Sequence, residues 1–162
     1  MAEIPRKAGS RERVRTFLET HGLAEHIVEF EQSTKTAAEA AEAMGCELGQ
    51  IVKTLVVVVD GRTPVAALVA GDRKGDMRVI AAELGGERAK MADADTVRSA
   101  TGYAIGGVSP FALPEALPVL FDDSLMRYEV VYPAAGTPAS MVRMDRDALL
   151  TVSAGRVARI SL

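Results

Sequence analysis

The stretch Ile51-Val52-Lys53-Thr54-Leu55-Val56-Val57-Val58-Val59 is an almost unbroken apolar run, rich in β-branched residues, and it predicts a buried strand. A second apolar segment covers residues 63–70. Asp60-Gly61-Arg62 lies between the two, and an Asp-Gly signal between apolar segments favours an antiparallel hairpin. The centre of the fold is therefore expected to be this pair of strands.

Lys53 is the one charged residue in the first of these strands. Because strand side chains alternate between two faces, Lys53 is expected to share a face with Leu55 and Val57. An ammonium on such a face is costly unless an anionic group meets it, which makes Lys53 a candidate site residue. The alternative is that its stem covers apolar surface while its charge reaches water.

Short helices and strands surround the hairpin in irregular order. Ser10 is a candidate N-cap and Gly22 a candidate stop for the first helix, and Thr36 with Glu39 has capping-box spacing. The pattern predicts helices over 10–21, 36–44, 76–84 and 93–100, a helical turn at 145–150, and strands at 27–30, 118–122, 128–132, 139–144 and 156–160. This order predicts a mixed sheet partly covered by helices rather than regular βαβ repeats.

The chain has 162 residues, which fits one domain, and neither an internal repeat nor a long linker divides it. Aromatic residues are only 4% and Trp is absent, so a platform for stacking several bases is not expected. The formal net charge of -3 argues against a protein that coats nucleic acid non-specifically.

Two local groups of basic residues could still meet phosphates. We expect residues 1–13 to be a basic N-terminal segment that frays, followed by the folded domain at 14–162. The alternative for both groups is a frayed terminus and solvated helix faces. Their members are Arg6, Lys7, Arg11, Arg13 and Arg15, and Arg73, Lys74, Arg78, Arg88 and Lys90.

Several kinds of chemistry are excluded by what the sequence lacks. Two histidines and one cysteine cannot supply four zinc ligands, and no acidic cluster has metal-ligand spacing, so we predict no metal. Cys46 is interpreted as a small apolar filler. No phosphate-binding or dinucleotide fingerprint is present, so no cofactor is expected. No leader and no apolar run of membrane length is seen, which predicts a cytoplasmic protein.

The second unusual stretch is Gly102-Tyr103-Ala104-Ile105-Gly106-Gly107-Val108-Ser109-Pro110. Glycines allow a main chain to approach a ligand closely, and the amides of Gly106 and Gly107 could converge on an oxygen that gains negative charge. Pro110 would stiffen the end of the loop. The alternative is an ordinary tight turn.

With both stretches in view, the sequence resembles the YbaK-type aminoacyl-tRNA deacylases, relatives of the editing domain of bacterial prolyl-tRNA synthetase. The resemblance rests on the segments 50–55, 91–93, 101–103 and 106–110 and spans about residues 14 to 160. It implies a compact α/β domain, of the mixed α+β kind, around a strongly curved mixed sheet. It also implies a trans-editing hydrolase that cleaves the ester of a mischarged aminoacyl-tRNA.

The resemblance also implies roles for individual residues. Lys53 would be the essential residue that contacts the terminal nucleotide or the aminoacyl group, and the loop from Gly106 to Pro110 would line the scissile carbonyl. Candidate catalytic groups are Lys53, Gly106 and Gly107. Candidate substrate-binding residues are Phe30, Thr36, Thr54, Val108, Ser109, Pro110 and Met141.

Phe30 and Met141 stand where the cysteinyl-specific branch of that family has Tyr and Asp. Both replacements remove a polar group, so specificity for Cys is not carried over, and a small uncharged amino acid such as Ala or Cys on tRNA(Pro) is the expected substrate. The expected mechanism is attack by water, helped by the ribose hydroxyl of the substrate, with backbone amides holding the oxyanion.

Two other functions stay open at this point. One is a catalytically weak module that binds tRNA or a synthetase, for which Phe30 and Met141 leave room; the other is an enzyme that processes free amino acids or peptides. The expected partners are the acceptor 3′ end of aminoacyl-tRNA and, as a candidate, an aminoacyl-tRNA synthetase. No membrane partner is expected, and we expect a monomer or a weak homodimer.

Overall fold

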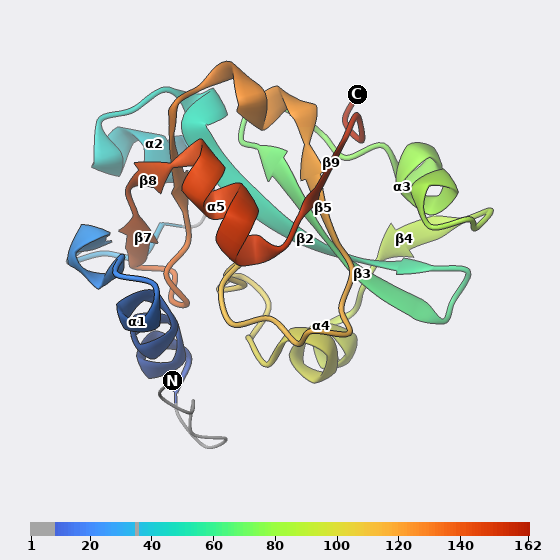
Figure 1. The fold of residues 1–162 in the computed structure, drawn as a ribbon, viewed down its shortest axis with the longest axis horizontal. Coiled ribbons are helices and arrows are strands. Elements are labelled where there is room, and N and C mark those ends of the chain that lie inside the picture. The colour runs from blue at the N-terminus through green and yellow to red at the C-terminus, as the bar shows by residue number, and fades with distance from the viewer. Residues whose placement is uncertain (1–8, 35) are drawn as a thin grey trace.

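The computed structural model describes residues 9–34 and 36–162, which form a mixed α/β fold (Figure 1). The α-helices in this part of the chain are α1 (Ser10–Thr20), α2 (Ala37–Met44), α3 (Met77–Glu83), α4 (Ala94–Thr101) and α5 (Arg146–Ser153). The strands are β1 (Ile27–Glu29), β2 (Ile51–Val59), β3 (Thr63–Ala70), β4 (Ala89–Met91), β5 (Val119–Asp122), β6 (Val130–Pro133), β7 (Ser140–Val142), β8 (Met144–Asp145) and β9 (Arg156–Ala158). Three short 3-10 turns complete the described elements: η1 (Ala24–His26), η2 (Leu48–Gln50) and η3 (Asp123–Arg127).

The main sheet is mixed and strongly curled, which confirms the predicted fold class. Its strand order is β8-β6-β2-β3-β5-β9, and β4 also pairs with β2. The β2–β3 pair is antiparallel, whereas β2–β6, β3–β5 and β5–β9 are parallel. A separate two-stranded sheet joins β1 to β7.

The predicted hairpin is confirmed residue by residue. The register of β2 with β3 runs from Val52 opposite Ala70 to Val59 opposite Thr63. The turn between them places Asp60 at φ 53° and Gly61 at φ 68°. Positive φ at both central residues matches the twist of the flanking strands, and this is why an Asp-Gly pair makes a good hairpin turn.

Both faces of the hairpin are buried, and alternate residues go to different cores. Val52, Ala66 and Leu68 belong to a cluster with residues of α1, α5 and the segment 103–121. Val57, Ala67 and Val69 belong to a second cluster with α3 and Ile160. Lys53 faces the second cluster, because it lies opposite Val69 in the register and Leu55 packs there.

The helix ends follow the predicted capping signals with one correction. The Thr36 hydroxyl accepts a hydrogen bond from the Glu39 amide at 3.1 Å, as the capping-box spacing predicts. The prediction of Ser10 as N-cap is wrong: Ser10 is the first helical residue of α1, and Gly9 is the N-cap, without a side-chain hydrogen bond. The predicted stop is confirmed, since Gly22 has φ 72°.

Some boundaries differ from the prediction because tertiary contacts decide them. No local pattern predicted β4, a three-residue strand that pairs with the end of β2. The strand expected at 139–144 is divided into β7 and β8 at Arg143, whose amide donates to the His26 carbonyl. The helical turn expected at 145–150 is the longer helix α5.

Of the basic segment 1–13, residues 1–8 lie outside the described residues, and residues 10–13 form the first turn of α1. Arg13 lies in the first turns of α1 and donates to the carbonyls of Gly102 at 3.1 Å and Ala112 at 3.0 Å. Its guanidinium carbon lies 4.7 Å from the centre of the Tyr103 ring. The helix is thus anchored to the segment that contains the glycine-rich loop.

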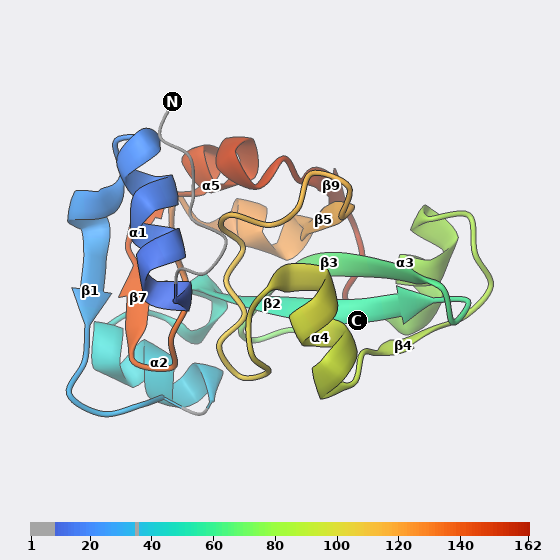
Figure 2. The same ribbon diagram turned by 90° about the horizontal axis from the view of Figure 1, so that it is seen from below.

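The elements divide between the two ends of the long hairpin. Figures 1 and 2 show α1, α2, β1 and β7 at one end and α3 with β4 at the other. Helix α4 lies along the middle of the hairpin, and α5 lies on the side opposite α4 in the view of Figure 2. Lys53, the third residue of β2, lies between the part of this strand that pairs with β6 and the part that pairs with β4.

Candidate active site

A cavity of about 360 Å³ opens beside the middle of β2. Lys53 and Gly106 both line it, so the structure brings together the two stretches that the sequence singled out. The wall also includes Thr54 and Val108. The remaining lining residues are Ala37, Val52, Leu55, Val56, Met91, Ala92, Val97, Ile105 and Ala134.

The rim of this cavity is apolar and open to solvent. Met91 is 52% exposed and Ile105 is 62% exposed, so two large apolar side chains lie in water at the mouth of the same cavity. Apolar side chains left in water at a cavity mouth mark a surface that gains free energy when a ligand covers it. The rim therefore suits a ligand with an apolar or aromatic part.

The ammonium of Lys53 is half-buried and has a partner within the protein. It donates a hydrogen bond to the main-chain carbonyl of Arg73, at the start of the loop after β3. Burial lowers the pKa of Lys53, the negative charge of Asp72 acts in the opposite direction, and the charge of Lys74 lowers it further. The ammonium is thus tied to a main-chain carbonyl of the loop after β3, in a solvent-exposed hydrogen bond.

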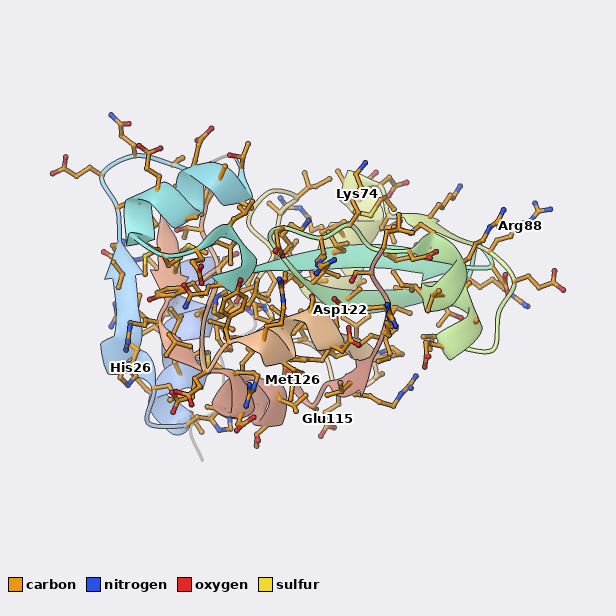
Figure 3. The ribbon with its side chains drawn as sticks, turned by 90° about the horizontal axis from the view of Figure 1, so that it is seen from above. His26, Lys74, Arg88, Glu115, Asp122 and Met126 are labelled. Carbon is orange, nitrogen blue, oxygen red and sulfur yellow. The ribbon has the colours of Figure 1, made fainter. Side chains whose placement is uncertain are left out.

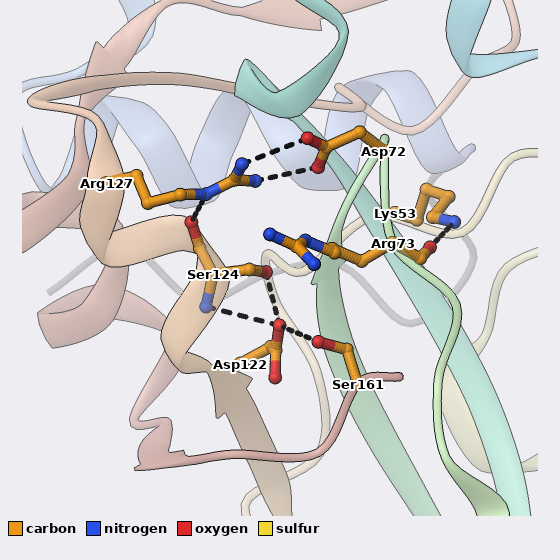
Figure 4. A network of polar contacts seen from close by, with 7 residues as sticks. All are labelled: Lys53, Asp72, Arg73, Asp122, Ser124, Arg127 and Ser161. Atoms are coloured by element: carbon orange, nitrogen blue, oxygen red, sulfur yellow. Dashed lines mark hydrogen bonds and ion pairs between the residues drawn. The ribbon is translucent and has the colours of Figure 1, made fainter.

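Asp72 is fixed by a bidentate ion pair. Arg127 donates to its two carboxylate oxygens at 3.0 and 2.7 Å, and the hydrogen bond from Arg127 holds the pKa of Asp72 below its usual value. Figure 4 shows this pair beside the Lys53–Arg73 contact. Since Asp72 and Arg73 are neighbours in the chain, the pair also fixes the carbonyl that receives the lysine.

Arg127 is connected through Ser124 to the buried carboxylate of Asp122. Its Nε donates to the Ser124 carbonyl at 2.6 Å, and Ser124 donates to Asp122 through both its amide and its hydroxyl. Asp122 is fully buried and also accepts from the Ile160 amide at 2.9 Å and the Ser161 hydroxyl at 2.8 Å. Figure 3 shows Asp122 inside the molecule, with Lys74 and Arg88 at the surface.

The two glycines of the loop are in different situations. Gly106 is exposed with φ 88°, a conformation that side-chain-bearing residues rarely adopt, and its amide has no hydrogen-bond partner within the described ranges 9–34 and 36–162. The Gly107 amide instead donates to the Ala104 carbonyl at 3.0 Å. Of the two glycine amides, that of Gly106 is the one free to donate to a ligand oxygen in this conformation.

Ser109 and Pro110 hold the loop rather than line the cavity. The Ser109 hydroxyl donates to the Ala134 carbonyl at 2.8 Å and accepts from the Phe111 amide at 3.2 Å. Ser109 is fully buried. Pro110 lines a separate apolar cavity together with Phe17. Of the three residues predicted after the glycines, Val108 alone reaches the cavity of Lys53.

Phe30 and Met141 do not line the cavity of Lys53 and Gly106. Phe30 lines a separate cavity beside α2, with Glu39 and Glu42. Met141 is 5% exposed and packs with Ile51 in the cluster behind α2, where Phe30 also packs. Burying apolar surface against α2 is favourable, and this explains the position of both side chains. Thr36 acts as the cap of α2, and its neighbour Ala37 lines the cavity.

Thr54 has an unusual polar group for a residue at the cavity wall. Its hydroxyl is buried, and it has no hydrogen-bond partner in the part of the chain that the structure describes. A buried hydroxyl without a partner costs free energy, so such a group calls for an explanation. Its place beside Lys53 makes a ligand the natural partner.

Cys46 packs as predicted, against the apolar cluster behind α2. Burial is the main reason that the pKa of its thiol is raised, which keeps it protonated and a poor nucleophile. Among the described residues, no group of three or more His, Cys, Asp and Glu side chains could hold a metal ion. In the same part of the chain, none of the helices has the length and apolar character to cross a membrane.

The site contains residues that the sequence did not single out. Asp72 and Arg127 are separated by 55 positions, so no local pattern could connect them. Arg13 was noticed only as one member of a basic group. Met91 and Ile105 lie in stretches that the sequence analysis quoted, 91–93 and 102–110, but neither was named as a site residue.

The fold and the cavity define an α/β protein with a small cavity beside a strongly curved mixed sheet. The family described as "Aminoacyl-tRNA editing domain" matches residues 31–152. The chain therefore belongs to this family.

Individual relatives agree with this assignment. The chain is 29% identical over 154 residues to the multifunctional Ser/Thr-tRNA deacylase ProXp-y of Escherichia coli (strain K12), covering 92% of each. It is 29% identical over 126 residues to a candidate Cys-tRNA(Pro)/Cys-tRNA(Cys) deacylase, EbsC of Enterococcus faecalis, covering 78% of this chain and 77% of the relative. A crystal structure of a candidate trans-editing enzyme for prolyl-tRNA synthetase superposes with a TM-score of 0.86 at 38% identity, covering 96% of this chain and 98% of the other.

Proposed function

We propose that this protein is a trans-editing deacylase, which hydrolyses the ester between a wrongly attached amino acid and the 3′-terminal ribose of a transfer RNA. The observation that carries the proposal is that Lys53 and Gly106 line the same cavity. Gly106 is exposed, and its amide has no hydrogen-bond partner within residues 9–34 and 36–162. A cation can bind the phosphate or oxygen-rich 3′ end, and a free amide can stabilise an oxyanion. Family membership agrees with this chemistry.

The reaction needs little from the protein beyond positioning. An aminoacyl ester is already activated, so water can attack the acyl carbon if it is held in line and the oxyanion is stabilised. The tetrahedral intermediate then breaks the bond to the ribose oxygen, which leaves with a proton. The products are the free amino acid and uncharged transfer RNA. A ribose hydroxyl of the substrate can orient the water.

Each wall of the cavity then has a proposed role. Lys53 anchors the terminal nucleotide, and the Gly106 amide donates to the oxyanion. Gly107 can contribute a second donor only if its hydrogen bond to Ala104 opens. Thr54 and Val108 contact the aminoacyl group, whereas Ser109 and Pro110 keep the loop in place.

The mainly apolar lining of the cavity favours an uncharged amino acid, and we propose a small one, Ala or Cys, as the substrate group. Among the relatives, ProXp-y is named for Ser and Thr, and EbsC is named for Cys. All of these side chains are small. A single methylene group discriminates by only about 1–3 kcal/mol in an apolar pocket, so several small side chains can be accepted.

A catalytically weak binding module is the second candidate. It is favoured by one observation: the Lys53 ammonium and the Gly107 amide already have partners inside the protein. Such a module would bind the acceptor end, or an aminoacyl-tRNA synthetase, without releasing the amino acid. An acidic chain attracts RNA weakly, so a synthetase is also a proposed partner for recruitment of the deacylase.

The test is a panel of mischarged transfer RNAs incubated with the purified protein. The panel includes Ala, Cys, Ser and Thr on tRNA(Pro), with the same amino acids on their own tRNAs as correctly charged comparisons and free aminoacyl esters as an RNA-free control. Release of a small amino acid from RNA supports the deacylase. Binding without release supports the module, and turnover of the free esters alone would contradict both.

A further inference from the structure

The cavity lies along the edge of β2 rather than on one of its faces. A cavity on one face of a strand is lined by alternate residues, because successive side chains point in opposite directions. Here five consecutive residues line it, Val52 to Val56. Met91 and Ala92, at the end of β4, and Ala134, directly after β6, stand at its two sides.

The reason is a gap in the strand pairing. On the side of β2 away from β3, β4 pairs with Val57–Val59 and β6 pairs with Ile51 and Val52. On this side of β2, between β4 and β6, no described strand pairs with residues 53–55. The cavity occupies the place where a further strand would lie.

Hydrogen bonds at the two ends of the gap show which main-chain groups of β2 face it. The Ile51 carbonyl accepts from Gly71, just after β3, at 2.7 Å, so the odd-numbered residues of β2 bond to β3. On the other side of β2, the Val56 carbonyl accepts from the Ala92 amide at 2.9 Å. The main-chain N–H and C=O groups of the even-numbered residues therefore point away from β3. Pro64, which has no N–H, lies opposite Val58, as this alternation requires.

Thr54 is the even-numbered residue in the middle of the gap. Its main-chain N–H and C=O both point toward the cavity, and neither has a partner within residues 9–34 and 36–162. Its buried hydroxyl is also unpaired there. Main-chain groups that no strand pairs are available to a ligand in the cavity, and a buried hydroxyl without a partner calls for an explanation, so these three groups on one residue point to a ligand.

We propose that the aminoacyl group of the substrate pairs with Thr54 as a one-residue antiparallel strand. The α-ammonium donates to the Thr54 carbonyl, and the Thr54 amide donates to the acyl oxygen. An amino acid carries these two groups with the spacing of a strand residue, so it fits the exchange of a hydrogen-bonded pair. The inference rests on the proposed deacylase function and assigns the second oxyanion donor, which Gly107 does not supply in this conformation.

The pairing also fixes where the substrate side chain lies. Side chains of residues directly opposite in an antiparallel pair project from the same face. An L-amino acid would place its side chain on the face of Thr54, toward Val56 and Val108, beside the unpaired hydroxyl. A D-amino acid would direct it to the opposite face, toward Lys53 and Leu55. Binding should therefore be selective for L-aminoacyl groups.

The experiment uses adenosine carrying L-alanine at the 3′ position through an amide, which cannot be hydrolysed. Its matched controls are the propionyl analogue, which lacks only the α-amino group, and the D-alanyl analogue. In the full-length ¹⁵N-labelled protein, the Thr54 amide should shift and gain protection from hydrogen exchange with the L-alanyl compound. Removing the α-amino group should weaken binding about tenfold or more, the size expected for a hydrogen bond to a charged group.

Two variants separate the main chain from the side chain. Thr54→Pro removes the N–H that faces the gap without removing a bond to β3, whereas Thr54→Val removes only the hydroxyl. Thr54→Pro should lose more analogue affinity and more hydrolysis than Thr54→Val. If Thr54→Pro does not fold, the amide measurements on the wild-type protein decide the question alone.

The outcomes distinguish this inference from the proposed function. Hydrolysis of mischarged transfer RNA together with equal affinity for the alanyl and propionyl analogues, and an unprotected Thr54 amide, would overturn the pairing while the deacylase stands. Hydrolysis of no mischarged transfer RNA would overturn the deacylase. Protection of the Thr54 amide by the L-alanyl compound alone supports the pairing.

Discussion

The ammonium of Lys53 donates to the main-chain carbonyl of Arg73, the residue next to the carboxylate that Arg127 holds. The position of the proposed anchoring charge thus depends on an ion pair outside the cavity. Arg127 is connected in turn to the buried Asp122 through Ser124 (Figure 4). This chain of contacts gives the site two properties that can be measured, a pH dependence and a dependence on remote residues.

Asp72→Asn should change the pH profile of the hydrolysis. The negative charge of Asp72 raises the pKa of Lys53, so its removal lets that pKa fall. Activity that needs the ammonium is then lost at lower pH than in the wild-type protein. The measurement is kcat/KM against pH, in which the alkaline limb should move to lower pH.

The matched control for this variant is Glu83→Gln. Glu83 forms a comparable ion pair with Arg156 at 2.7 Å, and neither residue lines the cavity. Its profile should coincide with that of the wild-type protein. Coincidence of the Asp72→Asn profile with the wild type would show that the pair does not tune Lys53.

Gly106→Ala should impair the site more than Gly107→Ala. A side chain at Gly106 meets open space, but its φ of 88° carries a cost of about 1–2 kcal/mol for any other residue. A Cβ at Gly107 would make ordinary contacts at 3.7 Å to Gly136 and Pro138 without backbone strain. Single-turnover hydrolysis should follow this order, and the reverse order would place the oxyanion donor at Gly107.

Asp122→Asn should destabilise the protein by about 2–4 kcal/mol, since the amide nitrogen cannot accept the hydrogen bonds that the carboxylate receives. Asp122 accepts from Ser124, Ile160 and Ser161. The exposed neighbour Asp123 is the control, and Asp123→Asn should change stability by no more than about 0.5 kcal/mol. Urea unfolding followed by circular dichroism measures both, and equal midpoints would contradict the assigned role.

Affinity for transfer RNA should fall as salt rises, since contacts to phosphates release counterions. Lys74 is exposed beside the Lys53–Arg73 contact, and Lys74→Ala should reduce the slope of log affinity against log salt by about 0.7–0.9. Arg143→Ala, at the end of the molecule where β1 and β7 lie, is the control and should leave the slope unchanged. A salt-independent affinity would contradict a phosphate contact.

Local patterns in the sequence were enough to predict the hairpin, the capping of α2 and the mixed sheet. They also identified Lys53 and Gly106, because a charge in an apolar strand and paired glycines are visible without a structure. Gly107 shows the limit of this reasoning. Its amide donates a hydrogen bond to the carbonyl of Ala104, three residues earlier. This detail of the turn geometry cannot be predicted from the residue types.

Long-range contacts were beyond the reach of the sequence. Phe30 and Met141 have the character of pocket residues, yet both pack behind α2, because burial rewards an apolar side chain wherever a core accepts it. The ion pair of Asp72 with Arg127 joins segments 55 positions apart. The gap in the pairing of β2 depends on where β4 and β6 end, and strand ends are set by tertiary contacts.

The most direct test of the account is the single-turnover hydrolysis of a mischarged transfer RNA by Lys53→Ala, with Cys46→Ser as the control. Lys53→Ala should lose most of the activity while its far-ultraviolet circular dichroism stays that of the wild-type protein, and Cys46→Ser should remain active because its thiol is a packed, protonated side chain. Wild-type activity in Lys53→Ala together with an inactive Cys46→Ser would contradict the account.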